Sequence, residues 1–293
     1  MIMEYLIENS SLHIVISGKG AEIQSVKNAD GTEYIWEGDP AFWEDRAINL
    51  FPIIGRLHKQ GYTVYGERYG MGLHGFLQDI ETEVIEKGED GITFRLQDSE
   101  STMSVYPFPF VLDIKYKLEG NKLNITFMVE NTGERDMYFG IGGHPGFALP
   151  FEKDLAFEDY FLEFEEGREP YRLWMAESEL MSGVEEAFAL RDGRYLDLKH
   201  SLFDKDAIIL RDMGHSVKLK ARSGERSVSV EFPDMRYLGL WHANETEAPF
   251  ICIEPWTSYQ ATEGETDAFD ERKDMLSLPP GETYRNEWSI TFH

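Results

Sequence analysis

The chain has 293 residues, of which 42% are hydrophobic and 13% aromatic, and it carries a formal net charge of −26. So acidic a balance argues against nucleic acid or an anionic membrane as a partner, because both bind basic surfaces. The single cysteine, Cys252, excludes an intramolecular disulfide framework. The N-terminal residues do not resemble a signal peptide, and no apolar run approaches the ~20 residues of a membrane span. We therefore expect a soluble, cytoplasmic protein.

Short apolar and aromatic runs separated by turn residues predict strands along most of the chain. The segment that begins with Asp39 and Pro40 predicts one short helical turn, because these residues favour the N-cap and the first helical position. Residues 171–189 are ambiguous and could hold a short helix. The expected strands are, in chain order, residue 6 and its neighbours, 13–17, 23–26, 34–36, the hairpins 62–69 and 114–129, a weaker hairpin at 190–196, the hairpin 217–232 and a closing strand at 288–292.

The order of these elements indicates the fold class. No helical periodicity recurs between the strands, so an alternating βαβ architecture is not expected. The chain also shows no fixed-period repeat and no linker rich in Pro, Gly or Ser. We predict an all-β fold, a large antiparallel β-sandwich with few short helices, formed by residues 1–293 as a single domain.

Several common functional motifs can be set aside. Residues 70–75 spell G-x-G-x-x-G, but a dinucleotide site needs a parallel strand before this motif and a helix after it. Here a hairpin precedes the motif, and the residues from Phe76 onward alternate like a strand, so we interpret the glycines as a tight loop beside His74. H-E-x-x-H, paired C-x-x-C, EF-hand and G-x-S-x-G motifs are absent. The sequence predicts no metal and no nucleotide cofactor.

Glu254 is the most unusual carboxylate of the sequence. The apolar run from Phe250 to Ile253 is typical of a strand covered on both faces, and Glu254 interrupts it with a charge before Pro255 ends the ladder. A carboxylate that is partly desolvated against Trp256 would have a raised pKa, in a range useful for a base. The alternative is a strand-end glutamate that reaches solvent or pairs with an arginine.

Three further residues are candidates for proton transfer or binding. His144 follows Gly142 and Gly143 and precedes a proline, as Glu254 does, which favours an extended and stiff backbone. Imidazole exchanges protons near neutral pH, but His144 could equally be a loop histidine bonded to a backbone carbonyl, and the same holds for His74. Arg56 is either a surface arginine or, given the apolar run before it, a partly enclosed guanidinium.

Together these segments resemble the aldose 1-epimerase (galactose mutarotase-like) superfamily, in particular its LacX-like branch. The similarity extends nearly from end to end and includes LFPIIGRL at 50–57, LHGF at 73–76, GGHPGFALP at 142–150 and APFICIEPW at 248–256. The resemblance implies a β-supersandwich fold. It also implies an enzyme that opens and recloses an aldose ring without a cofactor.

The resemblance assigns a role to each candidate residue. Glu254 would be the base that removes the proton of the anomeric hydroxyl, and His144 the acid that protonates the ring oxygen. His74 would hydrogen-bond the ring oxygen or an adjacent hydroxyl, and Arg56 would hold sugar hydroxyls. A sugar-binding aspartate falls at Asp204 or Asp206, of which we favour Asp206, and a solvated turn aspartate is the alternative.

The chemistry is consistent with these roles, because mutarotation removes one proton and supplies another, which a carboxylate and an imidazole can do. Trp256 and Phe76 could pack against a pyranose, whereas Trp241 is expected mainly in the core. We predict an aldose 1-epimerase for a free sugar, as a monomer or homodimer. A hexose 6-phosphate epimerase remains an alternative, although it would need an arginine cluster. A carbohydrate-binding or sensor protein without catalysis is a further alternative.

Overall fold

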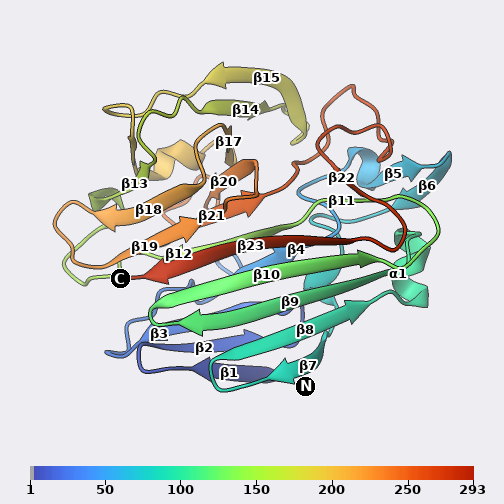
Figure 1. Ribbon diagram of the computed structural model, residues 1–293. Helices are drawn as coiled ribbons and strands as arrows, with labels where there is room; N and C mark the ends of the chain where they lie inside the picture. The colour runs from blue at the N-terminus through green and yellow to red at the C-terminus, as the bar shows by residue number, and fades with distance from the viewer. Residues whose placement is uncertain (1–2) are drawn as a thin grey trace.

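The computed structural model describes residues 3–293 and is built almost entirely of antiparallel β-strands (Figure 1). Within these residues the longest helix is α1 (Glu100–Val105), and the other helical segments are the 3-10 turns η1 (His58–Gln60), η2 (Leu77–Asp79), η3 (Phe157–Asp159) and η4 (His200–Phe203). None of the helices in the described part is long and apolar enough to cross a membrane. The predicted all-β antiparallel fold is confirmed.

A nine-stranded sheet forms one layer of the sandwich. Its longest strands pair through a tight turn, in which Gly120 adopts φ +61°, a conformation that glycine reaches without steric cost. In spatial order the strands are β16 (Tyr195–Asp197), β13 (Tyr160–Phe164), β18 (Ser216–Ala221), β19 (Ser227–Glu231), β23 (Thr283–Phe292), β10 (Lys122–Asn131), β9 (Phe110–Glu119), β8 (Gly91–Gln97) and β7 (Glu83–Lys87).

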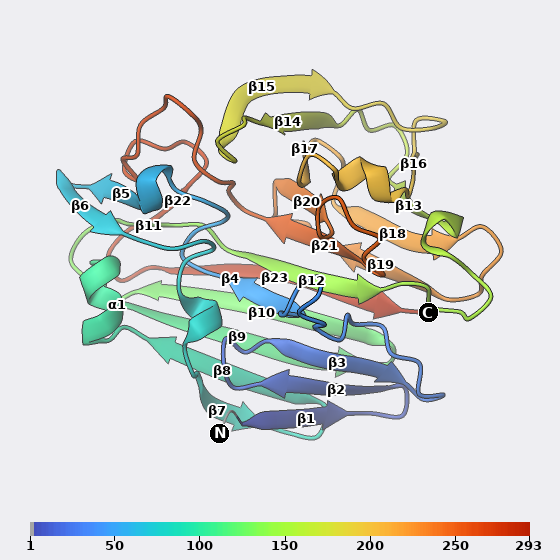
Figure 2. The same cartoon turned by 180° about the vertical axis from the view of Figure 1, so that it is seen from behind.

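A seven-stranded sheet forms the second layer and carries the strands of interest for function. Its order is β15 (Met181–Ala187), β14 (Tyr171–Met175), β17 (Ile208–Arg211), β20 (Tyr237–Trp241), β21 (Phe250–Trp256), β12 (Gly142–Ala148) and β4 (Ala47–Leu50). Three smaller sheets are β1 (Glu4–Glu8) with β2 (Leu12–Ser17) and β3 (Ile23–Asn28), β5 (Gly61–Val64) with β6 (Glu67–Gly70), and β11 (Met137–Phe139) with β22 (Leu276–Leu278). Seen from behind, β4 and β12 lie over the nine-stranded sheet, beside β1–β3 (Figure 2).

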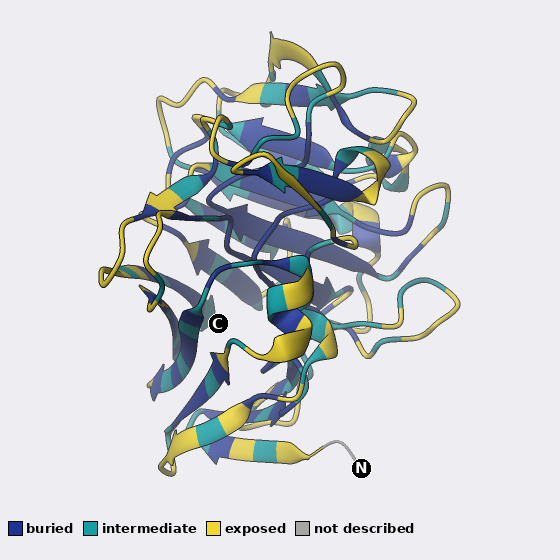
Figure 3. Cartoon of the chain, turned by 90° about the vertical axis from the view of Figure 1, so that its right-hand side faces the viewer, coloured by how far each residue is buried: buried dark blue, intermediate teal, exposed yellow. Residues whose placement is uncertain are grey.

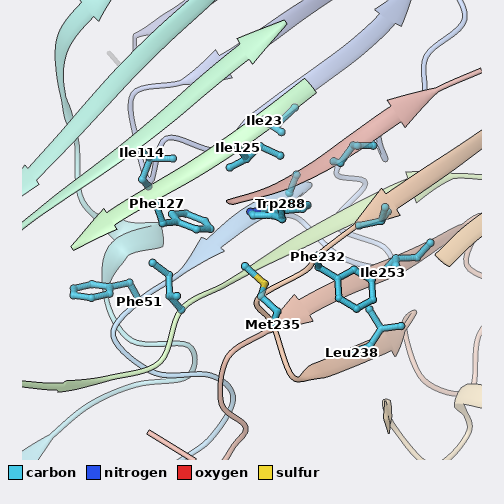
Figure 4. Packing of buried hydrophobic residues seen from close by; sticks show 14 of the residues in the cluster. Ile23, Phe51, Ile114, Ile125, Phe127, Phe232, Met235, Leu238, Ile253 and Trp288 are labelled. Carbon is cyan, nitrogen blue, oxygen red and sulfur yellow. The ribbon is translucent and has the colours of Figure 1, made fainter. Parts of the chain in front are cut away.

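The core lies between the two large sheets. Figure 4 shows side chains from both layers gathered there: Ile125, Phe127 and Trp288 come from the nine-stranded sheet, and Leu238 and Ile253 from the seven-stranded one. Strands near the middle of the molecule are buried along most of their length, whereas exposed residues concentrate in loops and outer strands (Figure 3). Every residue of β21 is buried, as the continuous apolar run in its sequence predicted.

The structure resolves the local expectations in different ways. The ambiguous residues 171–189 form the strands β14 and β15 rather than a helix. The segment from Asp39 makes the expected single turn, in which the Trp43 amide donates to the Asp39 carbonyl at 3.0 Å. The prediction that a strand begins at Phe76 is wrong: the 3-10 turn η2 follows Phe76, and the strand β7 begins only at Glu83. The Phe76 amide donates to the Phe51 carbonyl, which turns the chain back toward β4.

Candidate active site

His144 and Glu254 lie opposite each other on neighbouring strands. The register pairs Gly142 with Trp256 and Gly146 with Cys252, and so places His144 of β12 across from Glu254 of β21. Each of the two residues is followed by a proline, which has no N–H to donate to the ladder between them. His144 Nε2 lies 3.1 Å from Glu254 Oε2. The sequence-predicted acid and base are therefore brought into direct contact.

Both side chains are buried and incompletely paired. Glu254 is 1% exposed and His144 7%. Their contact does not have hydrogen-bond geometry, and neither Glu254 Oε2 nor His144 Nδ1 has a hydrogen-bond partner within residues 3–293. Most buried polar groups in proteins are hydrogen-bonded, so unpaired atoms of this kind call for a functional explanation. The sequence-level alternative, in which Glu254 is solvated or pairs with an arginine, is not what the structure shows.

The environment favours the uncharged form of each group. Burial raises the pKa of Glu254 well above its usual value, and the negative charge of Asp206 raises it further. Burial also lowers the pKa of His144 well below its usual value, with a smaller contribution from His74. A low-dielectric site disfavours charge on a carboxyl and an imidazole alike. The two shifts together favour a neutral carboxyl beside a neutral imidazole over an ion pair.

His74 is fixed in one tautomer by the backbone of Gly55. The Gly55 amide donates to His74 Nδ1 at 3.0 Å, and the His74 amide donates back to the Gly55 carbonyl. Because Nδ1 accepts, the proton of the neutral ring sits on Nε2, which is free to donate. Burial lowers the pKa of His74 to about 4, with a smaller effect of Arg56, so the ring is neutral. Its centroid lies 5.5 Å from that of His144.

The loop around His74 also explains part of the glycine-rich motif. His74 itself adopts φ +60°, which is uncommon for a residue other than glycine, and Gly75 follows at φ +83°. A Cβ at Gly75 would overlap the carbonyl of Phe51, so the two chain segments approach closely only because this residue is glycine. The interpretation of these glycines as a tight loop beside His74 agrees with the structure.

Arg56 lies at the edge of the site and already forms an ion pair. Its side chain is 46% exposed, and its Nε lies 2.9 Å from Oε2 of Glu179. Glu179 belongs to the turn between β14 and β15, and the side-chain amide of Gln260 donates to its backbone carbonyl at 3.0 Å. The guanidinium is therefore held by an acidic residue from a distant part of the chain.

These side chains surround a cavity of about 440 Å³. Aromatic rings form part of its wall: the ring of Trp43 lies 4.8 Å from that of His144, and the ring of Trp241 lies 5.8 Å from it. Asp206 lines the cavity, whereas Asp204 is exposed outside it. The lining residues are Phe42, Trp43, Asp45, Ile48, Gly55, Arg56, Leu73, His74, Gln78, His144, Met175, Glu179, Asp206, Ala207, Ile209, Trp241, Asn244, Glu254, Trp256 and Gln260.

One group of side chains near the cavity floor has the composition of a metal site. Potential ligand atoms of His144, Cys252 and Glu254 all lie within 4.8 Å of one another. Burial raises the pKa of the Cys252 thiol well above its usual value, and the charge of Glu254 adds to this. A metal binds the thiolate, so this environment disfavours the form of Cys252 that would be a ligand.

Comparisons with known proteins agree on one family. The model of the family described as aldose 1-epimerase matches residues 3–291. The chain belongs to the aldose 1-epimerase family. It is 31% identical to the chromosomal LacX protein of Lactococcus lactis subsp. lactis, over 97% of this chain and 98% of that protein.

Solved structures show that the aldose 1-epimerase fold is shared in detail. The chain superposes on a galactose mutarotase related enzyme from Lactobacillus acidophilus with a TM-score of 0.95 and 33% identity, covering 99% of this chain and 97% of the other. A galactose mutarotase-like protein from Lactobacillus casei gives a TM-score of 0.93 at 29% identity, with 99% and 100% covered. The resemblance seen in the sequence motifs is thereby confirmed.

Within this aldose 1-epimerase fold, the five residues selected from sequence all line one cavity: Arg56, His74, His144, Asp206 and Glu254. Of the aromatic candidates, Trp256 lines the cavity, but Phe76 does not and packs instead against Phe51 and Phe110. Trp241, expected mainly in the core, also lines the cavity. Sequence reasoning did not select Trp43, Asp45, Glu179, Asn244 or Gln260.

Proposed function

We propose that the protein is a mutarotase, an aldose 1-epimerase that interconverts the α and β anomers of a free, unphosphorylated aldose. The observation that carries this proposal is the 3.1 Å approach of His144 Nε2 to Glu254 Oε2, both buried at a cavity and both with unpaired polar atoms. Membership of the aldose 1-epimerase family supports the reaction type. A volume of about 440 Å³ falls in the ~300–1,000 Å³ range of small-molecule sites.

The directions of the pKa shifts suit a pair that works with a single proton. A neutral Glu254 beside a neutral His144 has the same number of protons as a carboxylate beside an imidazolium. The pair can therefore become a base and an acid together without net uptake or release of a proton, once the two groups adopt hydrogen-bond geometry. Sugar hydroxyls that enter the cavity would hydrogen-bond both groups and stabilise this charged arrangement.

The reaction then follows from two proton transfers. Glu254 takes the proton of the anomeric hydroxyl while His144 gives its proton to the ring oxygen, which breaks the bond between C1 and the ring oxygen and leaves an open-chain aldehyde. Rotation about C1–C2 presents the other carbonyl face. On reclosure His144 takes back a proton from the hydroxyl that re-forms the ring, and Glu254 returns one to the new anomeric hydroxyl.

The remaining predicted residues would position the sugar. His74 presents a neutral Nε2–H, which can donate to the ring oxygen or an adjacent hydroxyl. Asp206 and Arg56 add an acceptor and a donor at the cavity wall. Trp43 and Trp256, which also line the cavity, would supply apolar contacts to the C–H groups of a pyranose.

A phosphorylated substrate fits the cavity less well. A phosphate dianion is normally bound by several cationic donors. Among the lining residues within the described chain, Arg56 is the one lysine or arginine, and Glu179 already neutralises it. The same walls carry Asp45 and Asp206, which would repel a dianion. We therefore favour an uncharged sugar ring over a hexose 6-phosphate.

The proposed function is tested by following anomer relaxation of freshly dissolved α-glucose and α-galactose by polarimetry or NMR. We expect the protein to accelerate relaxation, and Glu254→Gln and His144→Asn each to lower kcat by about 10²–10⁴-fold, the usual contribution of a general acid or base. Sugar binding should persist in both variants. Asp204→Asn, which changes an exposed aspartate outside the cavity, is the control and should match wild type.

Two results would contradict the proposal in different ways. Equal rates for wild type and Glu254→Gln on every sugar tested would remove the carboxyl from the chemistry. Binding of sugars across a broad panel with no acceleration would instead identify a carbohydrate-binding protein.

A further inference from the structure

The charges around the cavity do not balance. The Arg56 guanidinium is offset by Glu179 at 2.9 Å, His74 is neutral, and burial favours the uncharged forms of His144 and Glu254. Asp45 and Asp206 remain as carboxylates at the wall that no cationic side chain of the lining offsets. A cavity with two uncompensated negative charges attracts a cationic ligand and repels an anionic one.

Asp45 stands out because nothing else accounts for its place at the wall. Within residues 3–293 it forms neither an ion pair nor a hydrogen bond, and the nearby Lys19 pairs with Asp79 at 3.2 Å instead. Burial raises the pKa of Asp45 to about 6, the charges of Glu22 and Glu44 contribute, and the charge of Lys19 offsets only part of this rise. A partly desolvated carboxylate without a partner gains from a bound cation more than a solvated one does.

The neighbours of Asp45 also suit a cation. Phe42 and Trp43, which precede it in the chain, and Trp241, whose ring centroid lies 5.7 Å from that of Trp43, are aromatic residues of the same cavity wall. Carboxylates combined with aromatic faces are a common way to bind an ammonium group. Glu254 is 1% exposed, lines the same cavity and has no hydrogen-bond partner for Oε2 within residues 3–293, so the acidic wall borders a cavity with an independent signature of ligand binding.

We propose that the cavity selects aldoses that carry a protonated amino group, the aminohexoses, over neutral sugars of the same size, with Asp45 as the residue that recognises the ammonium. This inference rests on the proposed function and names its substrate class. No new chemical step is involved, because the amine stays attached and protonated while the ring opens and recloses. Asp206, whose charge already acts on Glu254, strengthens the attraction.

The test compares matched sugars that differ in one substituent. Catalysed anomer relaxation is measured at pH 7 for glucose, 2-amino-2-deoxyglucose, 6-amino-6-deoxyglucose and N-acetylglucosamine, with the protein-free rate of each sugar subtracted. We expect kcat/KM of at least one amine to exceed that of glucose by about tenfold, the effect of one partly screened charge pair. N-acetylglucosamine, which has the bulk without the charge, should not share this gain. High salt should reduce the preference.

Two variants test whether the preference for amino sugars depends on Asp45. Asp45→Asn should bring the ratio of amine to glucose kcat/KM down to about 1–3, because its amide has no charge. Glu44→Gln is the matched control: it removes the same charge one residue away, from an exposed side chain outside the cavity, and should lower the ratio far less than Asp45→Asn does. If neither amine outperforms glucose, or if Asp45→Asn leaves the ratio as it was, the inference is wrong.

Failure of the inference and failure of the proposed function give different results. Glucose turnover without any amine preference would overturn the inference alone. Calorimetric affinities of the same four sugars provide a readout that needs no turnover. If an amine binds more tightly than glucose, in a manner that depends on Asp45, but no anomer relaxation is accelerated, the mutarotase proposal fails and the recognition of amines stands.

Discussion

Replacing His74 by asparagine would test whether this ring is neutral in the folded protein. Asparagine tolerates the φ of +60° found at this position, and its Oδ1 can accept the hydrogen bond that the Gly55 amide gives to Nδ1. The variant therefore keeps the loop and loses two things, the Nε2–H donor and the titrating group. The first loss should lower mutarotase activity, and the second should change how stability depends on pH.

The size and sign of the pH effect follow from the pKa of His74. Its folded-state pKa of about 4 lies below the usual 6.5, so between these values the unfolded chain binds a proton that the folded chain does not. The resulting stability is present above pH 6.5 and is lost as the pH falls toward 4. At 1.36 kcal/mol per pH unit, the full loss is about 3 kcal/mol, of which about 2 kcal/mol falls above pH 5.

The measurement is urea unfolding of wild type and His74→Asn at pH 7.5, 6.0 and 5.0. Lower pH is avoided, because a chain with 54 acidic residues loses its net charge and solubility as they protonate. The stability advantage of wild type over the variant should shrink by about 2 kcal/mol from pH 7.5 to 5.0. An exposed histidine changed in the same way, His215→Asn, serves as control. A wild-type advantage that stays constant within about 0.5 kcal/mol would refute a desolvated, neutral His74.

Two further substitutions test the packing of Gly143 and the ion pair between Arg56 and Glu179. In Gly143→Ala the added methyl group would overlap the ring of Trp288, so we expect the free energy of unfolding measured in urea to fall by about 1–3 kcal/mol. Gly72→Ala is the control: this position has open space around it, and the substitution should hardly change the free energy of unfolding. Glu179→Gln removes the partner of the Arg56 guanidinium, so kcat/KM for glucose 6-phosphate should rise by about 3–10-fold relative to that for glucose. Both values are measured by NMR of anomer relaxation. An unchanged ratio would show that this ion pair does not exclude anionic sugars.

The pair of strands that carries the catalytic candidates could be recognised from the sequence. The apolar run before Glu254 indicated a buried strand, and the charge that interrupts it marked a candidate base, although the sequence left a solvated or arginine-paired glutamate open. The proline after His144 and the one after Glu254 pointed to the same extended backbone. What sequence could not supply was the register, which depends on how two distant segments pair and which puts the two side chains face to face.

The rest of the cavity was beyond local reasoning, for a physical reason. Trp43, Glu179 and Gln260 sit in turns or after strand ends, and their position at the wall depends on tertiary packing rather than on any pattern around them. Glu179 lies 123 positions from Arg56 in the chain, and only the docking of the β14–β15 turn brings them together. In β20 the side chain of Trp241 points to the face of the sheet opposite to that of its neighbour Leu240, which is in the core. The alternation alone could not say that a cavity lies on the Trp241 face.

The acidic wall and the catalytic pair influence one another. Burial raises the pKa of Glu254, the charge of Asp206 raises it further, and both effects favour the protonated carboxyl. An ammonium bound near Asp45 and Asp206 would offset that charge, lower the pKa of Glu254 and favour the carboxylate that acts as the base. By the reciprocity of linked equilibria, the ionised pair would in turn bind the ammonium more tightly than the neutral pair does. Selectivity for aminohexoses should therefore appear in kcat as well as in KM, and an effect confined to KM would mean that the ammonium binds without acting on Glu254.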